Sequence, residues 1–175
     1  MLSQYNFKNL DDEELPEYKN EYDHNNNIIN GQLNTFYDDG SLNEEINYKN
    51  GKKNGEYKKY INNKLCYKSN YFNNILNGLY QEFYPNGKLK LEYNYNNYII
   101  NGIYKEYYES GELLEKSSYK NGNKDGRCCE YYENGNIKYE CMMINGLIHG
   151  LLKEYNEHGI ITNIYRYHNN IMIDL

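Results

Sequence analysis

The glycines of this chain recur at a fixed interval, and that interval constrains the fold more than any other feature of the sequence. Three series of glycines share a spacing of 24 residues, shortened to 23 at one place. The first series is Gly31, Gly55, Gly78, Gly102, Gly126 and Gly150; the second is Gly40, Gly87, Gly111, Gly135 and Gly159; the third is Gly51, Gly122 and Gly146. A period of this length is typical of repeat proteins, in which each unit packs on its neighbours.

Each 24-residue unit has the pattern of a β-hairpin. In the unit that begins at Gly102, residues 102–108 form the expected first strand, and Glu109-Ser110-Gly111 form a tight turn before the second strand. A three-residue loop that ends in glycine favours a type I turn closed by a G1 bulge. A longer turn, Asn121 to Gly126, is then expected to lead into the next unit. The glycines of all three series are therefore interpreted as structural turn residues.

These units predict an all-β fold, an elongated, twisted, single-layer antiparallel meander of about thirteen strands. The repeat domain is expected to span residues 16–175, with a half repeat at 16–30 and repeats that start near residues 31, 55, 78, 102, 126 and 150. Residues 1–15 lie outside the period and are expected to form a short helical or irregular cap. One residue is missing from the tight turn at Asn62-Asn63.

The register can be predicted by counting outward from each tight turn. Counting places an aromatic residue opposite an aliphatic one in every unit: Phe36–Leu42, Tyr60–Leu65, Phe83–Leu89, Tyr107–Leu113, Tyr131–Ile137 and Tyr155–Ile161. Such cross-strand pairs contribute about 0.2–1 kcal/mol each. A regular register would continue the same face with Tyr48, Tyr71, Tyr95, Tyr119, Met143 and Tyr167.

The other face of the predicted sheet combines tyrosine with glutamate and is the candidate partner-binding surface. Its candidate residues are Tyr80, Glu82, Tyr84, Tyr104, Glu106, Tyr108, Glu130 and Tyr132. Tyrosine is favoured at interfaces, and a row of carboxylates would attract a basic protein partner. The alternative interpretation is that the tyrosine columns hold the sheet together and that the glutamates are solvated surface.

The composition limits the classes of partner. The formal net charge is −6, which argues against nucleic acid and against docking on anionic lipid. No apolar run is long enough to insert into a membrane, and no secretory signal is visible, so a cytoplasmic location is expected, in the host cell if the source is viral. The 24 tyrosines supply apolar ring surface in a chain that is otherwise poor in hydrophobic residues.

No pattern of residues in the sequence indicates catalysis. The four cysteines lack metal-ligand spacing and are interpreted as free thiols, with Cys128 as an apolar substitute in a tyrosine slot. A regular register would place Cys129 opposite Tyr139 and on the same face as Cys141. The histidines fall in turns or near strand ends. We therefore expect no enzymatic activity, no metal site and no cofactor.

The repeat unit resembles a known family. Residues 126–150 show the pattern well, with Tyr131-Tyr132-Glu133-Asn134-Gly135 followed by Ile137, Glu140, Asn145-Gly146 and Gly150. This unit resembles the variant MORN repeat of many bacterial and giant-virus proteins, over about residues 16–174. The resemblance implies an elongated sheet of consecutive hairpins with a protein-binding or scaffold role. Some bacterial members are labelled as antitoxin or immunity components, so neutralisation of a cognate toxin is the alternative function.

Two further hypotheses concern binding. Aromatic hairpin repeats also occur in carbohydrate-binding proteins, but that class is expected to carry a secretion signal. The last strand is an open edge with the apolar residues Ile160, Ile161, Ile164 and Ile171 nearby. Because open edges pair with other chains, a homodimer through the C-terminal edge strand is expected.

Overall fold

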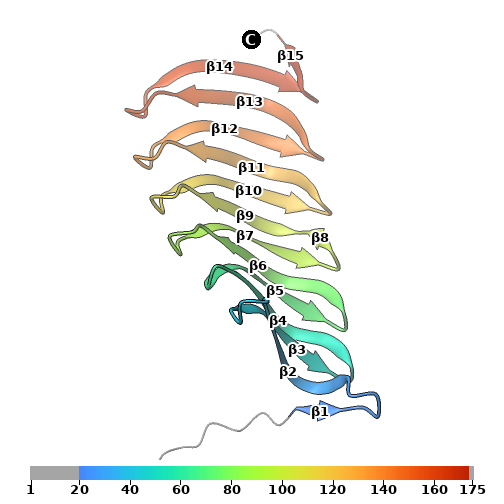
Figure 1. The fold of residues 1–175 in the computed structure, drawn as a ribbon. Helices are drawn as coiled ribbons and strands as arrows, with labels where there is room; N and C mark the ends of the chain where they lie inside the picture. Colours follow the sequence, from blue (N-terminus) through green and yellow to red (C-terminus); the bar gives the residue numbers. More distant parts are fainter. Residues whose placement is uncertain (1–19, 174–175) are drawn as a thin grey trace, which may run out of the picture.

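The computed structural model describes residues 20–173, which form one open antiparallel β-sheet of 15 strands. The strands follow one another across the sheet in chain order and build an elongated, twisted ribbon (Figure 1). No helix occurs within these described residues. The predicted all-β meander is confirmed, whereas the predicted cap at residues 1–15 lies outside the described residues.

The strands are β1 (Glu21–Tyr22), β2 (Ile28–Phe36), β3 (Leu42–Lys49), β4 (Lys52–Ile61), β5 (Lys64–Phe72), β6 (Ile75–Phe83), β7 (Leu89–Asn96), β8 (Ile99–Ile100), β9 (Gly102–Tyr107), β10 (Leu113–Lys120), β11 (Asn123–Tyr131), β12 (Ile137–Ile144), β13 (Leu147–Tyr155), β14 (Ile161–His168) and β15 (Ile171–Ile173). β8 and β9 together occupy the place of one strand, interrupted at Asn101. β1, in the predicted half repeat, pairs with β2.

The turns along one edge of the sheet have the predicted three-residue form. Between β9 and β10, the Tyr108 N–H donates to the Glu112 carbonyl oxygen at 2.8 Å, and the Gly111 N–H donates to the Tyr108 carbonyl oxygen at 2.9 Å. Gly111 has a φ of +101°, a backbone conformation that favours glycine. The other glycines of the second series also have positive φ in this slot.

The turns along the opposite edge are shorter than the sequence analysis predicts. Asn121 and Gly122 have φ values of +51° and +83°, which is typical of a two-residue type I′ turn. β11 begins directly afterwards at Asn123, so the predicted six-residue turn to Gly126 is wrong. The same short turn at Asn169-Asn170 leaves residues 171–173 to form β15, a strand that the longer turn would not allow.

The six glycines of the first series belong to strands, so their interpretation as turn residues is corrected. Five lie within a strand, and Gly102 is the first residue of β9. In the pairing of β5 with β6, Tyr71 pairs with Leu76 and Ser69 pairs with Tyr80, so three residues of β6 lie opposite Asn70 alone. Gly78 accommodates this irregularity with a φ of +106°, and a Cβ added there would lie 3.2 Å from the Asn70 Cβ.

The aromatic–aliphatic pairs beside the three-residue turns are confirmed in all six units, as in Tyr107 with Leu113. One residue further from each turn, a β-bulge interrupts the regular register. Glu106 pairs with Glu115 instead of Leu114, which is left without a partner. The bulge residues of the six units are Asn43, Cys66, Lys90, Leu114, Lys138 and Thr162.

The bulge reverses the predicted face of every residue beyond it in the second strand. Tyr95 pairs with Gly78 and its ring lies 6.1 Å from that of Tyr80, so it shares a face with Tyr80 and not with Phe83. The prediction that Tyr95 and its equivalents continue the face of Phe83 is therefore wrong. We call the side that carries Tyr57, Tyr80, Tyr93 and Tyr104 the tyrosine face, and the other side the opposite face.

The missing residue at Asn62-Asn63 is absorbed within its turn. Both asparagines have positive φ, 51° and 58°, so this hairpin closes with a two-residue turn. Tyr60 still pairs with Leu65, and the bulge falls at Cys66 as in the other units.

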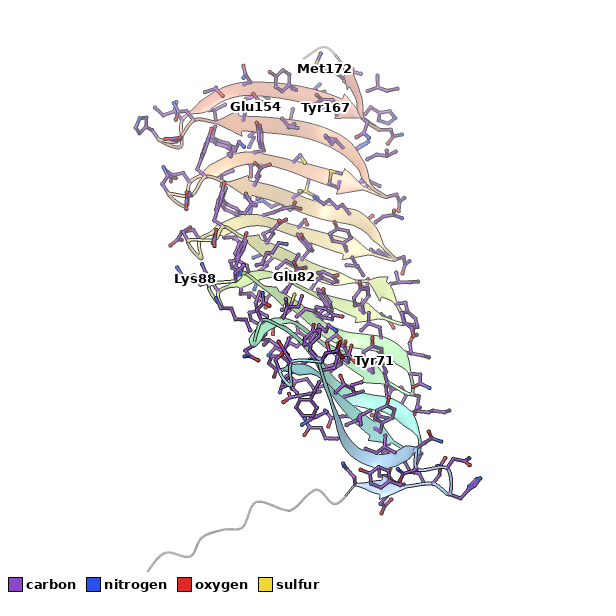
Figure 2. The ribbon with its side chains drawn as sticks, viewed as in Figure 1. Tyr71, Glu82, Lys88, Glu154, Tyr167 and Met172 are labelled. Carbon is purple, nitrogen blue, oxygen red and sulfur yellow. The ribbon has the colours of Figure 1, made fainter. Side chains whose placement is uncertain are left out.

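The sheet has no thick central core. Within the described residues, the buried side chains are Ile28, Ile46, Tyr57, Ser69, Ser117 and Cys129. Figure 2 shows side chains on both sides of the ribbon, with Lys88 at the edge of the three-residue turns and Tyr71 and Tyr167 towards the other edge. Stability must therefore come from contacts between neighbouring hairpins along each face.

Candidate functional site

A continuous stack of tyrosine rings runs along the tyrosine face from β4 to β10. The stack consists of Tyr57, Tyr67, Tyr80, Tyr93, Tyr104 and Tyr119, and neighbouring ring centroids lie 5.0–5.7 Å apart. Tyr71 and Tyr95 add edge contacts to Tyr57 and Tyr80 at 5.9 and 6.1 Å. Such aromatic pairs contribute about 0.5–1.5 kcal/mol each beyond the area they bury. The stack thus replaces the missing core in the middle hairpins.

Burial raises the pKa of several tyrosine hydroxyls in the stack. Burial raises the pKa of Tyr80 to about 12, with the charge of Glu82 as the next cause. Burial also raises the pKa of Tyr93 and Tyr104, and hydrogen bonds to Tyr95 and Glu106 add to these shifts. These tyrosines are therefore neutral hydrogen-bond donors, and Tyr104 donates to the Glu106 carboxylate at 2.9 Å.

At four of the turns, a tyrosine hydroxyl joins its hairpin to the next one. The Tyr84 hydroxyl donates to the Tyr107 carbonyl oxygen at 2.6 Å, and Tyr108 donates to the Tyr131 carbonyl oxygen at 2.7 Å. The same contact recurs from Tyr37 to Tyr60 and from Tyr132 to Tyr155. In the shortened hairpin Ile61 takes this slot, 48% exposed, and the hydrogen bond is absent there. Three candidate partner-binding residues, Tyr84, Tyr108 and Tyr132, thus have a structural role for their hydroxyls.

The candidate glutamates form part of a row that crosses the sheet beside the bulges. Glu106 pairs directly with Glu115, and Glu115 pairs directly with Glu130. We call Glu106, Glu115 and Glu130 the acidic row. Like charges that face each other across strands are unfavourable. Because Glu115 joins the row only through the bulge at Leu114, a regular register does not place it there.

Two lysines only partly neutralise this row. Lys124 forms an ion pair with Glu115, and Lys138 forms one with Glu130 at 2.7 Å. Lys138 is the bulge residue of the fifth hairpin. In the third hairpin the bulge residue is Lys90, which forms an ion pair with Glu82 at 2.6 Å. Leu114 stands in that slot between them, so Glu106 has no lysine from its own bulge. Within the described residues, Glu115 and Glu130 therefore form ion pairs with lysine, whereas Glu106 forms none and accepts a hydrogen bond from Tyr104.

The remaining candidate residues lie along the same face. Glu82 holds the same row position in the third hairpin, one residue before the end of β6. Glu154, which is not among the candidates, holds it in the sixth hairpin, one residue before the end of β13, and Figure 2 labels both glutamates. The structure therefore brings all eight candidates onto one side of the sheet. Tyr80 and Tyr104 lie in the ring stack, Tyr84, Tyr108 and Tyr132 lie at the turns, and the glutamates lie between.

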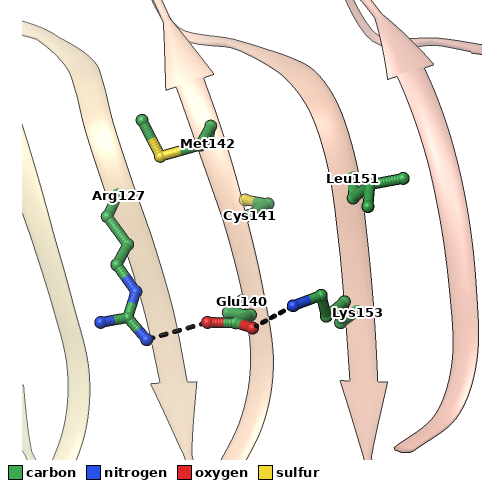
Figure 3. Close-up of a pocket in the computed structure, with 6 residues that line it drawn as sticks. All are labelled: Arg127, Glu140, Cys141, Met142, Leu151 and Lys153. Atoms are coloured by element: carbon green, nitrogen blue, oxygen red, sulfur yellow. Dashed lines mark hydrogen bonds and ion pairs between the residues drawn. The ribbon is translucent and has the colours of Figure 1, made fainter.

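The opposite face carries its own network around Glu140. The Glu140 carboxylate forms ion pairs with Arg127 at 2.8 Å and Lys153 at 3.1 Å (Figure 3). It also accepts a hydrogen bond from Tyr155 at 2.7 Å. These contacts, the Tyr155 hydrogen bond first, lower the pKa of Glu140 to about 2. Glu92 is held in the same way by Lys105, Gln81 and Tyr107. The carboxylates are fully engaged, so this network is structural.

The cysteines of the fifth hairpin differ from their predicted arrangement. Because the bulge lies at Lys138, Cys129 pairs with Glu140 and not with Tyr139, and Cys128 pairs directly with Cys141. Cys128 and Cys141 share the tyrosine face, while Cys129 is 3% exposed on the opposite face. The prediction that Cys129 shares a face with Cys141 is therefore wrong. The residue type at the bulge slot gives no signal for this shift.

Neither a metal centre nor a spanning helix is found in the part of the chain that the structure describes. Across residues 20–173, no group of three or more His, Cys, Asp or Glu side chains is placed to hold a metal ion. Over the same residues no helix is long and apolar enough to cross a membrane. The geometry that remains is an extended surface of stacked rings and paired charges.

The repeat identifies the family. The family described as the MORN repeat variant matches residues 29–50, 76–97, 100–121 and 124–145, which together cover just over half of the chain. No match was found among curated proteins. Each matched segment contains most or all of the two strands of one hairpin and the three-residue turn between them, which ends in a glycine of the second series. The chain belongs to the MORN repeat variant family.

Proposed function

We propose that this protein is a non-enzymatic binding or scaffold module that presents its tyrosine face to a protein partner with a basic segment. The single observation that carries the proposal is the acidic row, in which Glu106 and Glu130 both face Glu115 across adjacent strands. A fold gains nothing from placing three like charges together. The three carboxylates would instead favour binding of a partner with complementary basic residues.

The surroundings of the acidic row favour a protein ligand. The Tyr104 ring lies beside Glu106, and the Tyr108 ring lies at the adjacent turn, so apolar surface and charge occur together. Tyrosine contributes strongly to protein interfaces because a rigid ring loses little conformational entropy on binding. An arginine- or lysine-rich segment could lie across β9–β11 with its charges over the carboxylates and its aliphatic carbons on the rings.

Affinity capture with mass spectrometry, from a lysate of the source organism, tests the proposal. A Glu106→Gln, Glu130→Gln double variant should lose partners that the wild type captures, because the row keeps only Glu115, which Lys124 neutralises. Glu133→Gln, at an exposed turn, is the matched control and should capture them unchanged. Equal capture by all three proteins would contradict the proposal. Capture of one toxin that the protein neutralises would instead favour the antitoxin function.

A further inference from the structure

Three of the four cysteines lie in one hairpin, and the structure separates them by face. Cys128 in β11 and Cys141 in β12 are direct cross-strand partners on the tyrosine face. Cys129, the next residue along, pairs with Glu140 and Lys116 and points to the opposite side. Cys66 lies in the bulge of a different hairpin. The bulge at Lys138 therefore selects one pair of thiols out of four cysteines.

The backbone at this pair suits a disulfide. Direct partners in an antiparallel sheet have Cα atoms about 4.5–5.5 Å apart, and disulfides join residues whose Cα atoms lie about 4.4–6.8 Å apart. Neither residue is fully buried. A bond between them needs no change in register. Cys129 points to the other side of the sheet, so it could reach either sulfur only if the pairing register changed.

The charges around the pair make the two thiols chemically unequal. The pKa of Cys141 is lowered by its interaction with Cys128 and by the ammonium of Lys124, against the opposing influence of burial. The interaction with Cys141, together with burial, raises the pKa of Cys128. The Lys124 Nζ lies 3.9 Å from the Cys128 Sγ. The Cys128 S–H donates to the Glu115 carboxylate 3.8 Å away, which holds the proton on Cys128. Because the thiolate is the reactive form, Cys141 is the nucleophile and Cys128 is the thiol that resolves the product.

We propose that Cys128 and Cys141 form a redox modification site, which a peroxide-class oxidant converts into a cross-strand disulfide. The Cys141 sulfur attacks one oxygen of hydrogen peroxide; the S–O bond forms, the O–O bond breaks, and the departing hydroxide takes the former thiol proton as water. The Cys128 sulfur then attacks the sulfenic sulfur, the S–O bond breaks, and a second water leaves with the Cys128 proton. Two thiols are oxidised and one peroxide is reduced to two waters.

The position of the site gives the modification a structural consequence. Cys128 Sγ lies 3.8 Å from a carboxylate oxygen of Glu115, the central residue of the acidic row. A disulfide removes the Cys128 S–H that donates to Glu115 and covalently joins β11 to β12. The Met143 sulfur, 3.7 Å from the Cys141 Sγ, is the nearest competing target for the oxidant. The proposal stands on the thiol geometry and does not depend on the proposed partner.

The test is oxidation of the purified, reduced full-length protein with hydrogen peroxide, followed by thiol blocking, tryptic digestion and tandem mass spectrometry. Cleavage after Arg127, Lys138 and Lys153 places Cys128 and Cys141 in separate peptides, so the bridge is detected directly. The expected product is an intramolecular 128–141 bridge with Cys129 blocked as a free thiol. A bridge at Cys129, a bridge between chains, or oxidation confined to Met143 would overturn the proposal.

Single substitutions separate the roles of the two thiols. Cys128→Ser should abolish the bridge and accumulate a sulfenic acid at Cys141 that dimedone traps, whereas Cys141→Ser should abolish both products. Cys66→Ser and Cys129→Ser are matched controls that should keep the bridge. Equal dimedone labelling of Cys128 in Cys141→Ser would contradict the assigned roles. The bridge mapping uses the wild-type chain, so it holds even where a variant fails to fold.

Discussion

The middle hairpins and the fifth hairpin use the same slots with different chemistry. In β6 and β7 the central pair on the tyrosine face is Tyr80 with Tyr93, whose rings lie 5.0 Å apart. In β11 and β12 the equivalent pair is Cys128 with Cys141. Both hairpins keep the three-residue turn, the bulge and the irregularity at the strand glycine. The backbone of the repeat therefore fixes which side chains meet, and the residue type decides whether the contact packs rings or joins thiols.

The largest difference between the two regions should appear when each central residue is truncated. Tyr80→Ala removes a ring that contacts Tyr67, Tyr93 and Tyr95, and we expect it to lower the free energy of unfolding by about 3 kcal/mol. Cys128→Ala removes one sulfur atom and should lower it by about 1 kcal/mol. Urea denaturation of both variants measures the difference. Equal losses would show that the ring stack contributes no more than ordinary side-chain burial.

The strand glycines should matter in both regions, most where space is tightest. Gly78→Ala combines a φ of +106° with a Cβ 3.2 Å from the Asn70 Cβ, and we expect a loss of about 2 kcal/mol. Gly102→Ala is the matched control, because its φ is +95° but no atom lies within 4 Å of its Cβ position. A smaller loss of about 1 kcal/mol is expected there. Urea denaturation of both variants measures these losses of stability. A larger loss for Gly102→Ala than for Gly78→Ala would contradict the close contact predicted with Asn70.

The tyrosine hydrogen bonds at the turns join neighbouring hairpins, including those of the two regions, so their loss should lower the stability of the contact between hairpins. Tyr108→Phe keeps the ring but removes the hydroxyl that donates to the Tyr131 carbonyl oxygen at 2.7 Å, and we expect a loss of about 1 kcal/mol. Tyr139→Phe is the control, because no hydrogen bond of the Tyr139 hydroxyl is found within residues 20–173. Hydrogen exchange at the turn of residues 132–136 should also quicken in Tyr108→Phe. Equal stability and equal exchange rates in the two variants would show that the Tyr108 hydroxyl does not stabilise the contact between the hairpins.

A pH-dependent effect is expected in the fifth and sixth hairpins. The folded-state pKa of Glu140 is lowered from 4.5 to about 2, so its ionised form contributes stability above pH 4.5 that is lost as the pH falls towards 2. Glu140→Gln should therefore be less stable than the wild type at pH 7, by about 1 kcal/mol after screening by solvent. The two proteins should converge near pH 2. A difference that persists at that pH would show that charge is not the cause.

Part of this structure could be predicted from the sequence because the turns carry specific residues. Glycine at Gly111 and its equivalents marks the three-residue turn, and counting from it gives the aromatic–aliphatic pair correctly in every unit. The shortened turn at Asn62-Asn63 also follows from the missing residue. Local turn geometry therefore determines the register for the two residues on either side of each turn.

The register beyond that point could not be predicted, because the bulge has no residue signature. The six bulge residues are asparagine, cysteine, lysine, leucine, lysine and threonine. The position of the bulge depends on how the whole strands pair, which places Tyr80 opposite Tyr93 and Ser117 opposite Tyr104. The prediction that the strand glycines lie in turns is wrong for a related reason, because a positive φ occurs both in turns and in β-bulges. The acidic row and the thiol pair both depend on this bulge.

One bulge per hairpin places the tyrosine stack and the Cys128–Cys141 pair on the same face. Nuclear Overhauser effects in the reduced protein test it most directly. We expect contacts between the Cys128 and Cys141 β-protons and between the Tyr80 and Tyr93 rings, with Cys129 close to Glu140. Contacts that place Cys129 opposite Tyr139 and Cys128 opposite Glu140 would show a regular register and contradict the claim.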